Sequence, residues 1–439
     1  MKKLLKSKRR GSAIPLAVVA ILILLAMGVG LLSLGFNGRI YSLRTASDIK
    51  ARCAADAGLT MALFGMNEKL KVKPWNDSTL PEAIDVKLPY SDEVCSYRVI
   101  GNLAGGYTLQ SVGQSGEANR AVSATIRLMS AFDNAILTKN KLTLKSNTIV
   151  DGYNSLDPTD TDLEIDIGSQ SNAKDTITLN VGVVVKGDVF VAPGANLDTA
   201  VKVGGGTVKG DIYTAALEPL PPVVAPAGLL DKGAINVKGG TTTITPLNNG
   251  SYSAINLAGG NVKVDGVPSV IPGKLVVSGG DVVIRVTGDI QLDNTCEIIV
   301  KEGASLTIYT DGNIHCRNGS SISTENPPEE ATSIQIYGTS KDKFIDIKAK
   351  SDFTGVIYAP DSDVVLYAKG NAYGSVVADN FNYMAGGSFN YDKALQKKNN
   401  IDDEAVIFVV NRWYESAPAF SPDIKPADIV PMLELDPVK

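Results

Sequence analysis

Histidine is almost missing from this chain: His315 is the only one among its 439 residues. A metal site built from several histidines is therefore excluded, and a Ser-His-Asp triad would depend on this single side chain. His315 alternates with Ile314 and Cys316, so we expect it on the outside of a strand rather than in an active site. The sequence predicts no enzyme and no cofactor.

Aromatic residues are also scarce, and the 42 basic residues are slightly outnumbered by 47 acidic ones. Only 6% of the residues are aromatic, whereas 42 are glycine, a balance that favours a β architecture with many tight turns. The formal net charge is −5, which argues against a surface that binds nucleic acid. With 44% hydrophobic and 20% charged residues, the composition still predicts a large folded core.

Cysteine is limited to four residues, Cys53, Cys95, Cys296 and Cys316. An even number in an exported protein suggests disulfides. A string that begins at Gly279 recurs 24 residues later at Gly303, whereas Cys296 and Cys316 are 20 residues apart. In this register the two cysteines are therefore offset by four residues, about 13 Å along a strand. A disulfide requires Cα atoms within about 7 Å. We expect both to be small buried residues unless a corner separates them, and the disulfide state of Cys95, Cys296 and Cys316 stays open.

Charge is absent from the whole stretch between Arg10 and Arg39. A membrane-spanning helix needs only about 20 apolar residues, and the apolar part of a secretory signal is shorter, about 7 to 15. Six basic residues and no acidic one precede this run, which by the positive-inside rule places the N-terminus in the cytoplasm. These are Lys2, Lys3, Lys6, Lys8, Arg9 and Arg10. The sequence predicts a single-pass membrane protein with its bulk outside.

The boundary Arg9-Arg10-Gly11-Ser12, followed by an apolar helix, resembles the leader of type IV pilin-like proteins. In that family a prepilin peptidase cuts after the glycine, so the resemblance implies processing between Gly11 and Ser12. Leu16 stands where pilins usually carry glutamate, a departure also found among PilX-like members. The alternative is an uncleaved signal anchor.

Helical character continues beyond the span, with no proline before Pro74. It predicts one helix to about Leu70, roughly 85 Å long. Within it, AADAGLTMAL resembles the alanine-rich helix by which pilin-like and PilX-like proteins enter their globular head. The matching residues are Ala51, Ala54, Ala55, Asp56, Ala57, Gly58 and Ala62.

Three internal repeats follow. The string from Val185 recurs at Val208, that from Gly279 recurs at Gly303, and that from Gly355 recurs at Gly374. Periods of roughly 20 to 25 residues predict a parallel β-helix-like solenoid, so the fold class is mainly β behind a long N-terminal helix. A β-sandwich is the competing architecture.

The solenoid prediction assigns a direction to each side chain and a role to two glycines. Gly288 and Gly312 are expected to make turns with positive φ. The inward set is Val282, Ile284, Val286, Leu306 and Ile308, and the outward set is Arg285, Thr287, Thr307 and Tyr309.

The proline-rich string EPLPPVVAPAG predicts a linker, or a loop on one continuous solenoid. The expected organisation is a leader at 1–11, the helix at 12–70, a first β region at 71–217, the linker at 218–228, the solenoid at 229–395, and a cap and tail at 396–439. The segment from Asn400 is expected to form one more strand or a cap, with Trp413 and Tyr414 covering the last coil.

Two further strings, Phe353–Ser362 and Asn390–Leu395, resemble a bacterial domain of unknown function that often follows PilX-type N-terminal segments. With the N-terminal match, the resemblance spans most of residues 9–395. It implies an architecture and a context but no catalytic residues.

One acidic cluster, DPTDTDLEID, offers alternate carboxylates that calcium could bind. The candidate ligands are Asp157, Asp160, Asp162 and Glu164. It lacks the glycine and the terminal glutamate spacing of an EF-hand, and a solvated acidic loop is the alternative.

Two function classes follow. The first is a structural pilin-like protein, a minor pilin or pseudopilin of a type IV pilus or type II secretion-like machine. Its expected partners are the membrane, the prepilin peptidase and other pilin-like subunits, and a large head favours a tip position for initiation or adhesion. The second is a membrane-tethered module that binds surface glycans, or a polysaccharide-active β-helix enzyme.

Overall fold

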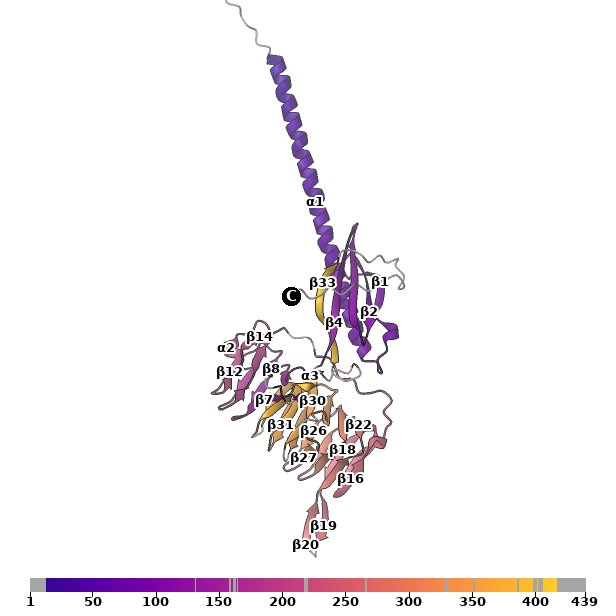
Figure 1. Cartoon of the computed structure of the whole chain (residues 1–439), viewed down its shortest axis with the longest axis vertical. Coiled ribbons are helices and arrows are strands. Elements are labelled where there is room, and N and C mark those ends of the chain that lie inside the picture. The colour runs from indigo at the N-terminus through magenta and orange to yellow at the C-terminus, as the bar shows by residue number, and fades with distance from the viewer. Residues whose placement is uncertain are drawn as a thin grey trace, which may run out of the picture. The chain divides into compact units, whose positions relative to one another are not determined.

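The computed structural model describes residues 13–130, 132–157, 159–160, 163, 165–216, 220–264, 267–327, 331–349, 352–384, 387–397, 401 and 406–416. The chain forms two compact units, which are described separately (Figure 1). The first consists of Met1–Glu68, Asn76–Arg127 and Val410–Lys439, and the second of Lys69–Trp75 and Leu128–Val409.

The first unit combines one long helix with an antiparallel sheet. Helix α1 (Ala13–Leu70) is continuous over 58 residues, which confirms the single helix predicted from the sequence. Five described strands form the sheet in the order β1-β2-β3-β4-β33, with antiparallel pairing from β1 through β4. The elements besides α1 are η1 (Asp77–Thr79), β1 (Glu82–Lys87), β2 (Val94–Asn102), β3 (Gly106–Ser115), β4 (Ala118–Ser130) and β33 (Val406–Ser416).

The C-terminal segment forms one more strand, which was one of the two expectations, but this strand does not cap the last repeat. β33 is the sheet neighbour of β4, although almost the whole second unit lies between them in the chain. Trp413 and Tyr414 lie on β33, and the Arg52 guanidinium of α1 is 5.3 Å from the Trp413 ring centroid. They belong to the antiparallel sheet because β33 extends that sheet instead of closing the last repeat. The second unit is thus inserted between two neighbouring strands of the first.

The second unit is built mostly from short strands, with two long ones near its end, and they are grouped here by their place in the chain. The earlier group contains β5 (Ile136–Thr138), β6 (Leu142–Leu144), β7 (Ile149–Tyr153), β8 (Asp166–Ser169), β9 (Ile177–Leu179), β10 (Val184–Val185), β11 (Asp188–Val191), α2 (Leu197–Ala200), β12 (Val201–Val203), β13 (Thr207–Val208) and β14 (Ile212–Thr214). The later group contains β15 (Ala234–Lys238), β16 (Gly240–Ile244), η2 (Pro246–Asn248), β17 (Gly250–Tyr252), β18 (Ala254–Ala258), β19 (Gly260–Val264), β20 (Val267–Ile271), β21 (Gly273–Val277), β22 (Asp281–Val286), β23 (Ile290–Leu292), β24 (Glu297–Val300), β25 (Ser305–Thr310), β26 (Ile314–Cys316), β27 (Ser321–Thr324), β28 (Ile334–Gly338), β29 (Lys343–Ala349), β30 (Phe353–Ala368), β31 (Ala372–Tyr383), β32 (Phe389–Asp392) and α3 (Ala394–Lys397).

These strands pair in parallel at the offsets that the three repeats predict. Val185 pairs with Val208, as the first repeat requires, and Val282 pairs with Leu306, as the second requires. Gly355 pairs with Gly374, which is the offset of the third repeat. In the described part of this unit, the β19–β20 hairpin is antiparallel and projects from the parallel strands (Figure 1).

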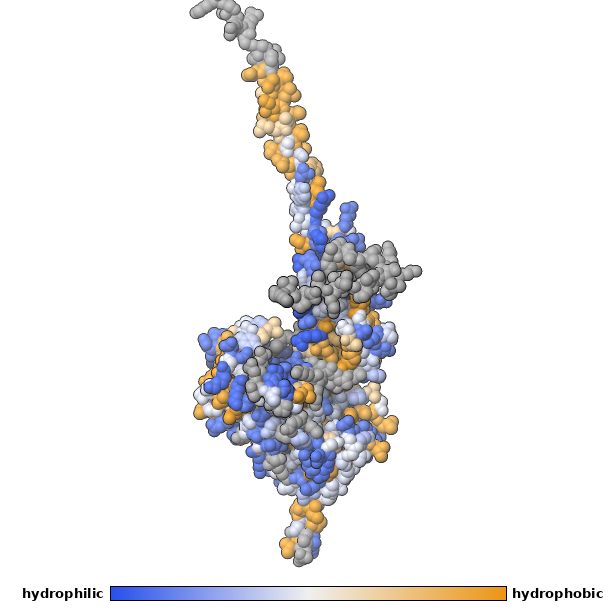
Figure 2. Space-filling model, viewed as in Figure 1, coloured by the Kyte–Doolittle hydropathy of each residue, from blue (hydrophilic) through white to orange (hydrophobic). Residues whose placement is uncertain are grey.

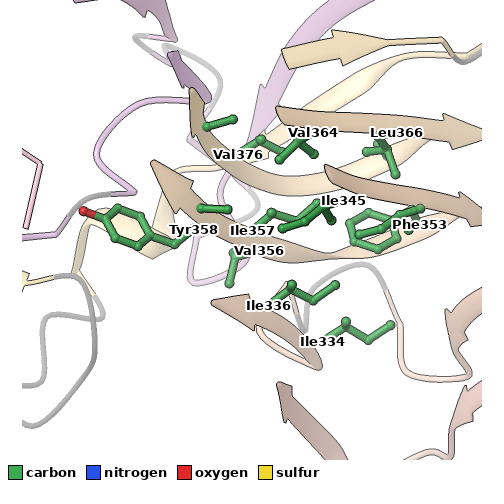
Figure 3. Packing of buried hydrophobic residues seen from close by; sticks show 14 of the residues in the cluster. Ile334, Ile336, Ile345, Phe353, Val356, Ile357, Tyr358, Val364, Leu366 and Val376 are labelled. Carbon is green, nitrogen blue, oxygen red and sulfur yellow. The ribbon is translucent and has the colours of Figure 1, made fainter. Parts of the chain in front are cut away.

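The core is a ladder of β-branched side chains, one from each successive strand. In parallel register, each inward side chain lies above its equivalent one repeat away, so similar shapes pack without gaps. Figure 3 shows part of it, with Ile336, Ile357 and Val376 on neighbouring strands. The ladder consists of Val189, Ile167, Ile136, Val376, Ile357, Ile336, Ile308 and Ile284, each at most 1% exposed.

The predicted side-chain directions are confirmed except at one tyrosine. All five residues of the inward set are buried, and Arg285, Thr287 and Thr307 are half-buried or exposed. Tyr309 is only 4% exposed. Its ring stacks on Tyr337 one repeat later, with centroids 5.2 Å apart, and Tyr337 in turn contacts Tyr358. The prediction that Tyr309 faces solvent was wrong because Tyr309 packs in a row with Tyr337 and Tyr358, whose hydroxyl bonds the proline-rich segment.

Gly288 and Gly312 are needed for a reason other than the predicted one. Neither has a positive φ. A Cβ on Gly288 would instead overlap the carbonyl of Ser253, and one on Gly312 would overlap the carbonyl of Gly288. These glycines therefore allow successive repeats to approach closely. Positive φ is found elsewhere in the same repeats, for example at the equivalent Gly279 and Gly303, with φ of 78° and 72°.

The proline-rich segment does not separate two compact units. Residues 128–216 and 220–409 belong to one unit, since β31 pairs with β5 and β6, and β32 pairs with β7. Tyr358, which points away from the other labelled side chains in Figure 3, donates its hydroxyl to the carbonyl of Pro221 at 2.7 Å. Leu220, Val223 and Ala225 pack against the core. The segment is thus a packed connection, which matches the alternative of a loop on one continuous stack.

Candidate functional site

The N-terminal part of α1 is an exposed apolar rod. From Leu16 to Phe36 its large hydrophobic side chains are 50% to 77% exposed. Figure 2 shows this stretch as a continuous orange segment. Among the described residues it is the one helix that is long and apolar enough to cross a membrane. Such a surface is not stable in water and requires lipid or other apolar helices around it.

The C-terminal half of α1 packs on the sheet through very small side chains. Ala51, Ala54, Ala55 and Ala62 are fully buried, as is Met66. A Cβ on Gly113 of β3 would overlap the backbone of Ala51 and Ala55, and one on Gly58 would overlap the Ser111 hydroxyl. The alanine-rich motif therefore lets the helix and the sheet backbones come close together.

Ion pairs fix the same half of α1 at its entry to the sheet. Asp48 pairs with Arg120 of β4, and Lys50 Nζ lies 3.1 Å from Glu93 Oε1. Glu93 also accepts hydrogen bonds from the Ser91 and Ser115 hydroxyls. The hydrogen bond from Ser91 is the main cause that lowers the pKa of Glu93 to about 2, and the hydrogen bond from Lys50 is the second cause. On β33, Glu415 lies 3.4 Å from Arg52. These ion pairs lie at the surface and add contacts between the helix and the sheet beside the buried alanine and glycine packing.

The predicted processing residues, Gly11 and Ser12, lie outside the described residues, as do Asp162 and Glu164 of the acidic cluster. The other two carboxylates have protein partners: Asp160 accepts from Asn154 at 3.0 Å, and Asp157 accepts from Thr159. Asp160 also lies 3.9 Å from Lys393. Among the described residues, no group of three His, Cys, Asp or Glu side chains is placed to hold a metal ion.

All four cysteines are free thiols, with Cys53 exposed and Cys95, Cys296 and Cys316 buried. Leu292 pairs with Cys316 across β23 and β26, as the second repeat predicts. Burial raises the pKa of Cys316 to about 11, so its thiol is protonated at neutral pH and is a poor nucleophile. The expectation of small buried residues at 296 and 316 is confirmed.

His315 lies on the outer side of β26, half-buried between the buried Ile314 and Cys316. Its ring centroid is 6.1 Å from that of Phe344. It lines a polar groove of about 560 Å³ together with Asp346 and Lys348. The sequence placed His315 on the outside but did not reveal this groove, since Gln291, Asp346 and Lys348 come from neighbouring repeats.

Comparison with known proteins gives a partial match to one family model, within the second unit. A family model described as a domain of unknown function (DUF7305) matches residues 235–398. The match contains both strings, Phe353–Ser362 and Asn390–Leu395, that carry the resemblance to a domain of unknown function. No curated protein matches the chain.

Among solved structures, the chain is similar to the competence-associated pilin ComZ from Thermus thermophilus. The alignment covers 84% of this chain and 98% of that one, at 13% identity and with a TM-score of 0.24. At this TM-score the two backbones do not superpose as whole chains, so nothing about fold or function is inferred from the likeness.

Proposed function

We propose that this protein is a pilin-like structural subunit, a PilX-like minor pilin or pseudopilin of a type IV pilus or type II secretion-like machine. The observation that carries the proposal is the division of α1 into two halves. One half is an exposed apolar rod, and the other packs through alanine and glycine on an antiparallel sheet. A subunit that passes from a membrane into a bundle of like helices needs this arrangement.

The rod stands in the membrane with its basic leader in the cytoplasm and the rest of the chain outside. Prepilin peptidase cuts between Gly11 and Ser12, which frees the rod for assembly with other pilin-like subunits. Leu16 is 77% exposed and leaves the start of the rod without an acidic side chain.

The inserted unit acts as a β-solenoid head, supported by parallel register at the offsets of all three repeats. The segment Leu128–Val409 makes up most of the chain and is too bulky to repeat along a dense filament shaft. We place the subunit at the tip, where it serves initiation or adhesion.

The role is non-catalytic. Besides Glu93, the pKa values that depart furthest from their ordinary range belong to the buried residues Cys316, Tyr358, Tyr383 and Tyr391. Desolvation by burial is the main cause for these four, which is typical of core positions. Depolymerisation of a polysaccharide by the purified full chain would contradict this role.

The processing step is tested by mass spectrometry of the mature N-terminus in cells that contain the native secretion apparatus. We expect a chain that starts at Ser12, and the Gly11→Leu variant serves as an uncleaved control. An intact Met1 in the wild-type protein would overturn the pilin-like proposal.

Assembly is tested on filaments sheared from the same cells. We expect the wild-type chain in the sheared fraction at a small ratio to the main subunit, and the Gly11→Leu variant only in the membrane fraction. Equal amounts of the wild type and the variant in the sheared fraction would contradict assembly through the processed helix.

A further inference from the structure

The polar groove on the second unit has no part in assembly through α1, and a ligand bound in it deepens the adhesion role proposed above. It lies on the outer face of β23, β26 and β29 and has a volume of about 560 Å³. Its main lining side chains are Gln291, Asn294, His315, Arg317, Asp346 and Lys348. All of them belong to the described residues.

Strand register arranges the groove residues in rows. Gln291 pairs with His315, and His315 pairs with Asp346, so these three outward side chains form one row across three strands. Arg317 and Lys348 stand two positions farther along the chain than His315 and Asp346 and begin a second row. Neighbouring strands are about 4.8 Å apart, and the sheet holds this spacing rigidly. The groove therefore presents a preformed grid of polar groups.

The charges in the groove balance one another. Arg317 Nε lies 3.4 Å from Asp293 Oδ1, and Lys348 Nζ lies 3.1 Å from Asp346 Oδ2. Lys348 also donates to the Cys316 carbonyl, which fixes the ammonium group at the floor. Because each cation already has an anion beside it, the groove favours an uncharged ligand over an acidic one.

Hydrogen-bonding capacity remains in the groove after these pairs are counted. Asp346 Oδ1 is buried, but the side chain as a whole keeps 17% of its surface exposed, and its Oδ2 beside Lys348 can accept a further hydrogen bond. Gln291 and Asn294 are exposed at the rim, and each amide offers both donors and an acceptor. A ligand with many hydroxyl groups matches this set, since each hydroxyl also donates and accepts.

Two aromatic rings border the grid on the same face. Phe344 is 39% exposed beside His315, and Tyr367 is 37% exposed with Lys348 Nζ 5.4 Å from its ring centroid. Phe344 and Lys348 alternate on β29 with the buried Ile345 and Ile347, so they share the outward side. Partly exposed rings beside polar groups give a surface for the apolar face of a sugar ring.

We propose that this groove binds a neutral carbohydrate chain lying across β23, β26 and β29. Gln291, Asn294 and His315 bond its hydroxyl groups at the rim, and Asp346 accepts from a hydroxyl at the floor through Oδ2. Phe344 and Tyr367 support its sugar rings at the edges of the grid. The head thereby attaches to surface glycans without chemical change to the ligand.

His315 supplies a probe inside the site, because it is the only histidine in the chain. The full-length protein, in detergent and without a histidine tag, is labelled with ¹³C-histidine, and its single imidazole signal is followed by NMR. The ligands are cellohexaose, maltohexaose, mannohexaose and chitohexaose, with hexagalacturonate as the acidic comparison. We expect a saturable shift of the His315 signal with at least one neutral hexaose and a smaller response to hexagalacturonate.

Two groove variants and one matched control locate the binding. Asp346→Asn and the double variant Gln291→Ala/Asn294→Ala should each raise the Kd at least tenfold, and the rim residues are exposed, so the double variant folds. Thr307→Ala, on β25 outside the groove, should leave the Kd unchanged. No shift with any neutral hexaose at millimolar concentration would overturn the proposal. So would a response to hexagalacturonate alone, or a Kd that both groove variants leave unchanged.

Discussion

At the scale of single residues, size and charge decide how α1 meets its sheet. Ala51 and Ala55 present almost no side chain, and Gly113 presents none. The backbones therefore approach more closely than larger side chains allow. Lys50 and Asp48 then fix the helix to Glu93 and Arg120. Two predictions follow from these contacts, one for volume and one for charge.

Adding one methyl group at Gly113 should destabilise the first unit. In Gly113→Ala the new Cβ overlaps the backbone of Ala51 and Ala55, which cannot move aside as a flexible side chain could. We expect a loss of about 1 to 3 kcal/mol in the free energy of unfolding. Hydrogen exchange of peptides from residues 94–127 measures it. Gly105→Ala is the control, since its Cβ would meet only the Asn102 side chain, with Oδ1 nearest at 3.3 Å; an equal loss there would contradict the explanation.

The carboxylate of Glu93 should make the first unit sensitive to acid. The folded state lowers the pKa of Glu93 from 4.5 to about 2, so its contribution to stability is fully present above the unfolded value. It should be lost as the pH falls from about 4.5 toward 2. Unfolding curves of the wild type and Glu93→Gln, compared between pH 7 and pH 2, should differ at neutral pH and converge near pH 2. A stability difference between the two proteins that stays constant from pH 7 to pH 2 would mean that ionisation of Glu93 is not the cause of the acid sensitivity.

At the scale of elements, the parallel strands owe their stability to identical neighbours one repeat away. Ile284, Ile308 and Ile336 occupy equivalent positions on β22, β25 and β28 and are completely buried. Outward positions on the same strands vary from Val283 to Thr307 and Gln335. The inward ladder therefore carries the packing, while the outward side is free to vary and, on β23, β26 and β29, to form a polar groove.

Truncation within this ladder should be costly. Ile308→Ala removes atoms that contact both neighbouring repeats and leaves a cavity between them, so we expect a loss of about 2 to 5 kcal/mol. Thr307→Ala, one position away on the outward side, should change stability by no more than about 0.5 kcal/mol. Chemical denaturation of the full chain, followed by hydrogen exchange of residues 281–310, distinguishes them. Similar losses for the two variants would mean that the ladder is not the main source of stability.

At the scale of the whole molecule, the chain order is that of an insertion. β4 ends at Ser130 and β33 begins at Val406, yet the two strands are neighbours in one sheet. The two connections lead into a unit whose earlier and later strands meet where β31 pairs with β5 and β6. The sheet of the first unit, with its five described strands, is thus complete without any strand from the inserted unit.

Deletion of the inserted unit should leave the first unit folded. In this variant a Gly/Ser linker of about 15 residues replaces residues 132–405. We expect it to keep the antiparallel sheet, because such a linker is long enough to join the end of β4 to the start of β33 whichever way β33 runs. Hydrogen exchange protection in β2, β3 and β4 is the measurement. Full exchange of these strands, in a variant that still reaches the membrane, would show that the sheet depends on the inserted unit.

Periodic and local features were predictable from the sequence. The apolar rod, the extent of α1, the offsets of the three repeats and the inward direction of Val282, Ile284 and Leu306 are each properties of neighbouring residues or of exact repetition. Hydrophobic runs and repeats act over short stretches or one repeat, so a single sequence contains enough information to assign them.

Only the tertiary structure decided what joins distant segments. It placed β33 beside β4, stacked Tyr309 in a row with Tyr337, packed the proline-rich segment against the core, and brought His315 and Asp346 together in one groove. Each of these depends on contacts between residues far apart in the chain, whose pairing is set by the packing of the whole unit. The sequence by itself determined an anchor helix and a repeated strand, and long-range packing determined where the repeats are inserted and which outward side chains meet.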